Sequence, residues 1–162
     1  MKGHPEIIEA LNDVLTAELT AINQYFAHSE ICEHWRYERL YQAIREEAIH
    51  EMKHAELVIG RVLYLDGMPN MSRYSEIKIG PNVKQMLEND QALEQDAIVR
   101  LNQHIELARV HQDFGTEELL EAILKDEEEH IDWIEAQLDQ IAQVGIQNYL
   151  AQQIVPHAGA NE

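Results

Sequence analysis

The amino-acid sequence predicts an all-α protein, a four-helix bundle with one long crossover connection and a short C-terminal fifth helix. The composition favours helix over strand, because Ala, Leu, Glu and Gln are abundant while the 162 residues include only four Pro and seven Gly. Four long segments place apolar residues at steps of three and four, as bundle helices do. We expect a single domain over residues 1–162, with the bundle at about 5–144, the short helix at about 146–155 and a polar, disordered tail at 156–162.

The first helix is predicted to begin at Pro5 and to end between Glu33 and Arg36. Its inward stripe consists of Ile8, Leu11, Leu15, Glu18, Ile22 and Tyr25. The second helix is predicted to begin around Tyr37 and to stop at the Asp-Gly-Met-Pro-Asn run of residues 66–70. Its stripe consists of Leu40, Ile44, Glu51, His54, Val58 and Leu65. Both stripes are therefore apolar except where Glu and His interrupt them.

The third helix is predicted to open after the Gly-Pro-Asn run at 80–82, with an inward stripe of Val83, Leu87, Asp90, Glu94, Ala97, Leu101, His104 and Ala108. The run from Asp113 to Thr116 predicts a tight break, with Thr116 as the N-cap of the fourth helix. The stripe of the fourth helix consists of Leu120, Ile123, Glu127, His130, Ile134 and Ile141. Gly145 ends this helix, and a short amphipathic segment follows, in which Ile146, Tyr149, Leu150 and Ile154 are expected to expose an apolar stripe on a lone subunit.

The positions of the turns predict the topology. The midpoint between Glu18 and Glu51, and that between Glu94 and Glu127, both fall in or beside predicted turns, so each half is expected to be an antiparallel helical hairpin. The link at residues 66–82 is 17 residues long, whereas neighbouring antiparallel helices are usually joined by two to eight. A link that returns along the bundle must span about 38 Å, and a fully extended chain of this length reaches about 56 Å. We therefore expect parallel second and third helices joined by a crossover.

A Glu followed 33 residues later by Glu-x-x-His occurs twice in the chain. The two sets are Glu18 with Glu51 and His54, and Glu94 with Glu127 and His130. Because residues three apart lie on one face of a helix, each Glu-x-x-His offers two ligands side by side. The predicted topology brings all six side chains to one level of the core.

Four carboxylates on one level of a core require compensating charge. Burial of an ionised carboxylate without a partner costs several kcal/mol, and neighbouring carboxylates repel one another. Arg61 is the one basic residue that we expect within reach. Two divalent cations would balance the four charges with both imidazoles neutral, and carboxylate with imidazole suits iron or manganese. The alternative is that these acids lie on solvated faces.

The formal net charge of −18 would repel phosphate backbones and anionic lipids, so we expect neither nucleic-acid nor membrane partners. The single cysteine, Cys32, rules out an internal disulfide. No signal peptide and no span of about 20 apolar residues is recognisable. These features predict a soluble cytoplasmic protein that binds cations.

Five runs of the sequence resemble bacterioferritins, a haem-binding, ferritin-like iron-storage family. They are Met-Lys-Gly at 1–3, Ala-Ile-Asn-Gln-Tyr-Phe at 21–26, Glu-Met-Lys-His-Ala at 51–55, Glu-Glu-Glu-His-Ile-Asp-Trp at 127–133 and Gln-Asn-Tyr-Leu at 147–150. Ferritin-like di-iron proteins also take a Glu from each of two helices and Glu-x-x-His from each of the other two. The resemblance covers nearly the whole chain.

The resemblance implies a cage of 24 subunits that oxidises Fe(II) with O2 or H2O2 and stores the Fe(III) as a mineral. It leaves open whether a second subunit type co-assembles, and a ferredoxin-like reductant is the expected partner for iron release. The implied ligands of two iron ions per subunit are Glu18, Glu51, His54, Glu94, Glu127 and His130. By the same resemblance, Glu51 and Glu127 bridge the two ions, and Tyr25 lies beside them.

The resemblance also implies that Met52 is a ligand of haem b, with one Met from each of two subunits. Met52 lies about 100° round the helix from Glu51, so it faces away from the predicted metal site. The residues expected to line an apolar haem pocket are Leu19, Phe26, Ile49 and Ile59. From the residues alone, the alternative is an interface methionine that binds no haem.

Glu46, Glu47 and His50 lie about one turn before Glu51 and His54, as either an accessory inner iron site or a solvated acidic face. Two other functional classes compete with iron storage. The first is a di-iron or di-manganese peroxidase or catalase, although the chain has no Cys-x-x-Cys pair for a rubrerythrin-like peroxidase. The second is a haem electron-transfer or structural bundle whose acids confer solubility.

Overall fold

Five helices make up most of residues 1–154, the part of the chain that this computed structural model describes. They are α1 (Pro5–His34), α2 (Glu38–Tyr64), α3 (Val83–Val110), α4 (Phe114–Val144) and α5 (Ile146–Gln153). The predicted all-α class is confirmed. The predicted C-terminal tail at 156–162, and the last residue of the predicted fifth helix, lie outside the described residues.

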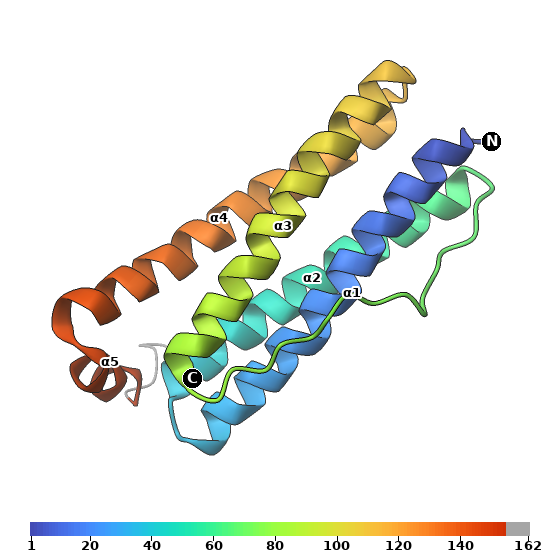
Figure 1. The fold of residues 1–162 in the computed structure, drawn as a ribbon. Helices are drawn as coiled ribbons and strands as arrows, with labels where there is room; N and C mark the ends of the chain where they lie inside the picture. Colours follow the sequence, from blue (N-terminus) through green and yellow to red (C-terminus); the bar gives the residue numbers. More distant parts are fainter. Residues whose placement is uncertain (155–162) are drawn as a thin grey trace, which may run out of the picture.

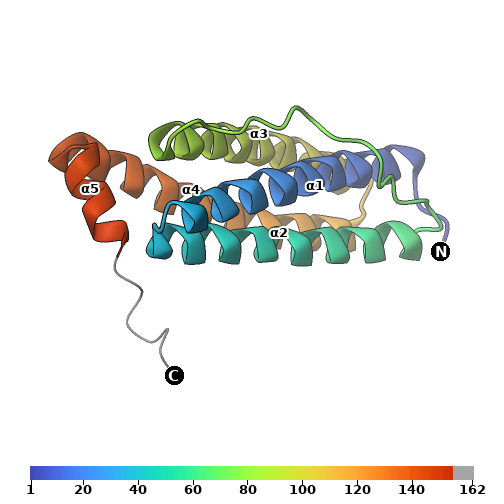
Figure 2. The same cartoon turned by 90° about the horizontal axis from the view of Figure 1, so that it is seen from below.

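The four long helices form two antiparallel hairpins, α1 with α2 and α3 with α4, that pack side by side (Figures 1 and 2). The connection after α2 runs back along the bundle before α3 begins, so α2 and α3 point the same way. The predicted bundle with one long crossover is therefore confirmed.

The crossover lies along α1 and is held by polar side chains at every fourth position of that helix. These buried side chains are Asn12, Thr16, Thr20, Gln24 and His28. The backbone N–H groups of Ser75, Lys78 and Gly80 donate to the last three of them over 2.9, 2.9 and 3.0 Å. The crossover thus lies along a polar ladder on α1, whose side chains accept hydrogen bonds from these backbone N–H groups in place of a strand or helix.

Three helices end in residues with left-handed backbone conformation that are not glycine. Arg36, Asp66 and Gln112 have φ of 66°, 58° and 56° and follow α1, α2 and α3. Asp113 rather than Thr116 is the N-cap of α4, since its carboxylate accepts from the backbone N–H of Thr116 over 3.1 Å. The predicted cap was therefore wrong by three residues, because Thr116 instead occupies the first turn of the helix.

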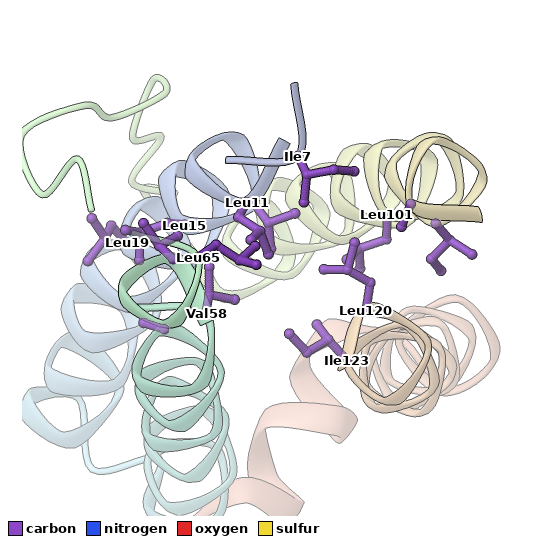
Figure 3. Packing of buried hydrophobic residues seen from close by; sticks show 14 residues of the cluster. Ile7, Leu11, Leu15, Leu19, Val58, Leu65, Leu101, Leu120 and Ile123 are labelled. Atoms are coloured by element: carbon purple, nitrogen blue, oxygen red, sulfur yellow. The ribbon is translucent and has the colours of Figure 1, made fainter. Parts of the chain in front are cut away.

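The apolar core consists of two clusters, one toward each end of the bundle. The cluster toward the chain's N-terminal end includes Ile7, Leu11, Leu15, Leu19, Val58, Leu65, Leu101, Leu120 and Ile123 (Figure 3). The other cluster includes Ile44, Met86, Leu87, Ile134 and Tyr149. The predicted stripes supply most of both clusters. On α3, however, Ile105 is buried although it was not assigned to the stripe, while the stripe residues Ala97 and His104 are only half-buried. Between the clusters lies a level of buried acids and histidines.

Gly145, with φ of 81°, separates α4 from α5 and lets the chain turn sharply. Tyr149 of α5 is buried, and its hydroxyl donates to Gln137 over 2.8 Å. The expectation that Tyr149 helps to expose an apolar stripe was wrong, because this ring packs inside the subunit. Ile146 and Ile154 do remain exposed. Within residues 1–154, no helix is both long and apolar enough to cross a membrane.

Candidate metal centre

Six side chains from all four long helices meet at the polar level between the two apolar clusters. They are Glu18, Glu51, His54, Glu94, Glu127 and His130, each 2–6 % exposed. Their donor atoms form two groups, within each of which all the atoms lie within 4.8 Å of one another. Glu51 and Glu127 belong to both groups, while the other four residues belong to one each. The arrangement is that of two adjoining four-donor sites that share two carboxylates.

His54 is the centre of the first group. Its Nδ1 lies 3.2 Å from Glu127, 3.3 Å from Glu51 and 3.6 Å from Glu18. Its Nε2 lies 3.1 Å from Oδ2 of Asp126, a half-exposed carboxylate on α4. One nitrogen therefore faces the buried carboxylates, while Asp126 holds the other and fixes the ring's orientation.

Glu94 is the centre of the second group. Nδ1 of His130 lies 2.7 Å from Oε1 of Glu94, and the Tyr25 hydroxyl donates to the same oxygen. The rings of Tyr25 and His130 meet edge to face with centroids 5.3 Å apart. Glu94 is thus held by two partners before any cation is present.

Burial and mutual repulsion change the pKa values of the four buried carboxyl groups by different amounts. Burial raises the pKa of Glu18, Glu51 and Glu127, and the charges of the neighbouring glutamates raise those of Glu51 and Glu127 further. Burial acts in the same direction on Glu94, but the hydrogen bond and charge of His130 outweigh it and lower the Glu94 pKa. Without a metal ion, this level is therefore expected to hold protons on several of its acids.

The two histidines gain protons from the same environment. Burial disfavours the charged form of His54, but its hydrogen bonds to Glu127, Glu18 and Glu51 outweigh burial and raise its pKa well above the ordinary range. The hydrogen bond and charge of Glu94 likewise outweigh burial and raise the pKa of His130 to about 9. Protons on the histidines supply part of the positive charge that bound cations would otherwise provide.

No Lys or Arg of residues 1–154 forms an ion pair with the four glutamates; the ion pairs they form are with histidines. Arg61, which was expected within reach, instead donates to Asp113 over 2.6 Å and to Thr116 over 3.0 Å. A cavity of about 20 Å³ lies between these carboxylates, Glu18 and Glu94 among its lining residues. All four glutamates line this cavity, whereas neither histidine of the centre does. Taken together, the carboxylate and imidazole donors of the centre suit divalent iron or manganese.

A wider pocket of about 460 Å³ lies between α2 and α4 and is lined by both histidines of the centre. Glu47 and His50 also line it, and Nδ1 of His50 lies 3.5 Å from Glu47. Glu47 further lies 3.7 Å from Nδ1 of His130, whereas Glu46 is exposed and does not line the pocket. Of the three residues considered for an accessory site, Glu47 and His50 therefore line the pocket beside the centre.

Met52 lies on a different face of α2 from Glu51. Its side chain is 49 % exposed, while Glu51 is 2 % exposed. Of the residues expected around a haem, Leu19 is buried, and Phe26, Ile49 and Ile59 are half-buried. A soft thioether is thus exposed on α2, the helix that carries Glu51 and His54.

Two features of the centre escaped the sequence analysis. Asp126 follows no stripe, although its position beside Glu127 could have suggested it. His28 and Asp90 form a fully enclosed pair, with Nδ1 2.9 Å from Oδ1, and Gln24 also donates to Asp90 over 2.8 Å. The four-residue recurrence of polar side chains along α1 is the signal that would have found His28.

The chain matches the ferritin-like domain family over residues 8–144. It is 46 % identical over 151 residues to a bacterioferritin of Streptomyces coelicolor, covering 93 % of this chain and 90 % of that protein. It is 43 % identical to bacterioferritin BfrA of Mycobacterium tuberculosis, over 94 % of this chain and 96 % of that protein. A bacterioferritin of Brucella melitensis is 42 % identical over 92 % of each chain. With its four-helix fold and crossover, this chain belongs to the bacterioferritin family of ferritin-like proteins.

Proposed function

We propose that this protein stores and detoxifies iron by oxidising Fe(II) to Fe(III) at the buried centre and holding the ferric mineral inside a 24-subunit cage in the cytoplasm. The observation that carries the proposal is the enclosed level of four glutamates and two histidines, on which no Lys or Arg of residues 1–154 acts as counter-ion. Membership of the bacterioferritin family supports the same function.

In this proposal Fe(II) is the substrate, and two iron ions together supply two electrons to O2 or H2O2. Glu51 and Glu127 hold both ions, since these carboxylates belong to both donor groups. Glu18 with His54 completes one site, and Glu94 with His130 completes the other. Each divalent ion that enters displaces protons from the acids and histidines whose pKa values are raised. Tyr25 keeps the Glu94 carboxylate turned toward its own site.

The pocket between α2 and α4 is the proposed entrance for Fe(II). Glu47, Asp126 and Glu129 line it, so its charge attracts cations. A chain with a formal net charge of −18 adds to this attraction at low ionic strength. Release of stored iron requires electrons, for which a small ferredoxin-like protein is the proposed donor.

Cage assembly is proposed to cover apolar side chains that a lone subunit exposes. Leu57, Leu63 and Tyr64 are each more than half exposed along α2, and Ile146 and Ile154 are exposed at the two ends of α5. Closed symmetric assembly would bury such groups. Native mass spectrometry should find 24 chains in one particle, whereas a monodisperse monomer at physiological salt would contradict the storage function.

Haem b is proposed to bind between two subunits through Met52 of each. The exposed thioether fits this role because a haem ligand on a symmetry axis must lie on the subunit's outer face. Met52→Leu should remove the haem absorption band while cage and rapid Fe(II) oxidation survive. Met71→Leu is a matched control, since Met71 is also 49 % exposed. Full haem content in Met52→Leu would leave Met52 as an interface side chain only.

Iron uptake itself is tested by adding Fe(II) and oxidant to the metal-free protein. The expected result is rapid oxidation followed by accumulation of soluble ferric mineral that elutes with the cage. A peroxidase or catalase would consume H2O2 catalytically without retaining iron. A haem electron carrier would show no rapid Fe(II) oxidation.

A further inference from the structure

Three potential metal ligands lie together at the end of the bundle where the chain begins. They are His4 before α1, Glu6 in its first turn and His111 just after α3. One donor atom of each lies within 4.8 Å of the others. His4 and Glu6 are exposed and His111 is half-buried, so the group is open to ions from solvent.

The carboxylate of Glu6 lies between the two rings. Its Oε2 is 2.7 Å from Nε2 of His111 and 3.7 Å from Nδ1 of His4. The two rings face each other with centroids 4.0 Å apart and planes tilted by 30°. Ligands of a tetrahedral zinc ion at 2.0–2.1 Å lie roughly 3.4 Å from one another. Both separations from the Glu6 carboxylate lie within about 0.7 Å of that value, and the donor atoms of the two histidines lie within 4.8 Å of each other. A bound ion would draw these nitrogens together and turn the facing rings so that their lone pairs converge on it.

The backbone that carries His4 is held in place. The backbone N–H of Gly3 donates to the carbonyl of Leu65 over 2.8 Å, and the terminal amine donates to the carbonyl of Tyr64 over 3.1 Å. Pro5 has a fixed φ and also restricts the backbone of His4, the residue before it. His111 is fixed in turn as the C-cap of α3. Ordering the three ligands on metal binding would therefore cost little conformational entropy.

The protonation state of His4 also suits metal binding. Its Nδ1 accepts a hydrogen bond from the backbone N–H of Glu6, which requires a lone pair on that nitrogen. This bond is long, at 3.3 Å, so exchanging it for a metal bond forfeits little. At His111 a cation would replace the proton shared between Nε2 and the Glu6 carboxylate. Two neutral imidazoles and one carboxylate are a ligand set that Zn²⁺ and similar ions take in proteins.

We propose that His4, Glu6 and His111 bind one divalent transition-metal ion of the zinc type, with water at the remaining position. The ion would join the start of α1 to the end of α3, and so fasten one helical hairpin to the other. Glu6 precedes Glu18 by 12 residues, or about 18 Å along α1, so this site is separate from the buried centre. It does not depend on the proposed iron chemistry.

The test is a titration of untagged, metal-free protein with Zn(II), followed by calorimetry and by metal analysis after desalting. The decisive variant is His4→Asn, because Asn retains the helix-capping ability of this position but removes the imidazole. His111→Ala is the second variant. His34→Ala is the matched control, since His34 is exposed and belongs to no candidate metal group among the described residues.

Wild-type protein and His34→Ala should bind one more Zn(II) per chain than His4→Asn and His111→Ala. Zn(II) should also raise the midpoint of thermal unfolding further in wild type than in these two variants. Rapid Fe(II) oxidation should be the same in all four proteins, which separates this site from the buried centre. Equal Zn(II) content in wild type and His4→Asn would overturn the proposal, as would an equal loss in His34→Ala.

Discussion

In the α1–α2 hairpin, Glu18 is one of the three carboxylates that lie around Nδ1 of His54, and burial raises the Glu18 pKa. In the α3–α4 hairpin, Glu94 has both Tyr25 and His130 as partners, and its pKa is lowered. The two hairpins place Glu and Glu-x-x-His at the same interval of 33 residues. An identical spacing therefore produces one carboxyl group that tends to hold a proton and one that stays ionised.

The main difference lies in how each motif histidine pairs, since Nδ1 of His130 lies 2.7 Å from Glu94 whereas Nδ1 of His54 lies 3.6 Å from Glu18. Residues outside the repeated motif add to this difference. Tyr25 belongs to α1 yet donates to Glu94 on α3, and no hydroxyl of residues 1–154 makes the matching contact with Glu18. Asp126 contacts His54 from the solvent side, whereas the stacked ring of Trp133 lies 6.3 Å from His130. The spacing along each helix thus determines which ligand side chains meet, and contacts with the neighbouring helices determine the pKa of each carboxyl group.

The largest expected effect is on the rate of Fe(II) oxidation, for which both the Glu18–His54 half and the Glu94–His130 half of the centre should be required. Glu18→Ala and Glu94→Ala should each slow rapid Fe(II) oxidation by at least about 10-fold, because each removes a proposed ligand. Both variants should keep the wild-type helix content. Stopped-flow oxidation is the measurement, with the exposed Glu46→Ala as control. Wild-type rates in both variants would remove this centre from the proposed function.

The free energy of unfolding of the metal-free protein should respond in opposite directions to substitutions in the two halves of the centre. Glu18→Gln removes an acid whose ionisation is disfavoured by burial, so it should stabilise the fold by about 1–3 kcal/mol. Glu94→Gln leaves Tyr25 and a charged His130 without their anionic partner and should destabilise it by about 1–3 kcal/mol. Urea unfolding after exhaustive iron removal gives both values. Changes of the same sign would mean that the two hairpins do not differ as described.

The pH dependence of the metal-free protein sharpens the same contrast. The pKa values of Glu18, Glu51 and Glu127 are raised, so their contribution to stability is complete below the ordinary value of 4.5 and is lost as pH rises. His130, with its pKa raised to about 9, loses its contribution as pH rises from 6.5 through that value. The pKa of Glu94 is lowered, so its contribution to stability is present above pH 4.5 and is lost as the pH falls below that value.

Unfolding free energy should therefore fall between pH ~5 and ~9, by up to about 1.4 kcal/mol per pH unit for each proton that the native state retains. Fe(II) under anaerobic conditions should reduce this slope, because the cations replace the retained protons. Chemical denaturation at several pH values, with and without Fe(II), measures it. A stability of the metal-free protein that rises over this range would contradict the assigned pKa shifts.

The smallest expected effect concerns the hydroxyl that distinguishes the halves. Tyr25→Phe should lower the stability of the metal-free protein by about 1 kcal/mol, since Glu94 loses one hydrogen-bond donor in the core. The Glu94–His130 half would then resemble the Glu18–His54 half more closely. Tyr74→Phe, at a 48 % exposed tyrosine, is the control and should change little. Equal stability of the two variants would show that this contact contributes nothing to the difference between the halves.

The helices and the six converging side chains were predictable because both depend on periodicity. Apolar steps of three and four locate the helices, and the equal intervals from Glu18 to Glu51 and from Glu94 to Glu127 put the acids level. The ends of the helices were also predicted to within a few residues, but the backbone conformation that follows them was not, since Arg36 and Gln112 adopt a conformation that sequence rules assign to Gly or Asn. Contacts between helices, such as that of Tyr25 with Glu94, leave no periodic trace in the sequence.

The polar ladder on α1 has a consequence for the dynamics of the crossover. A segment without helix or strand ordinarily exchanges its amide hydrogens quickly, because water reaches its backbone. The amides of Asn70, Ser75, Lys78 and Gly80 instead donate to side chains of α1. They can exchange only when the crossover detaches from that helix. Their exchange rates would therefore report how often the irregular connection between the hairpins opens, and these four amides should exchange more slowly than the other amides of the crossover.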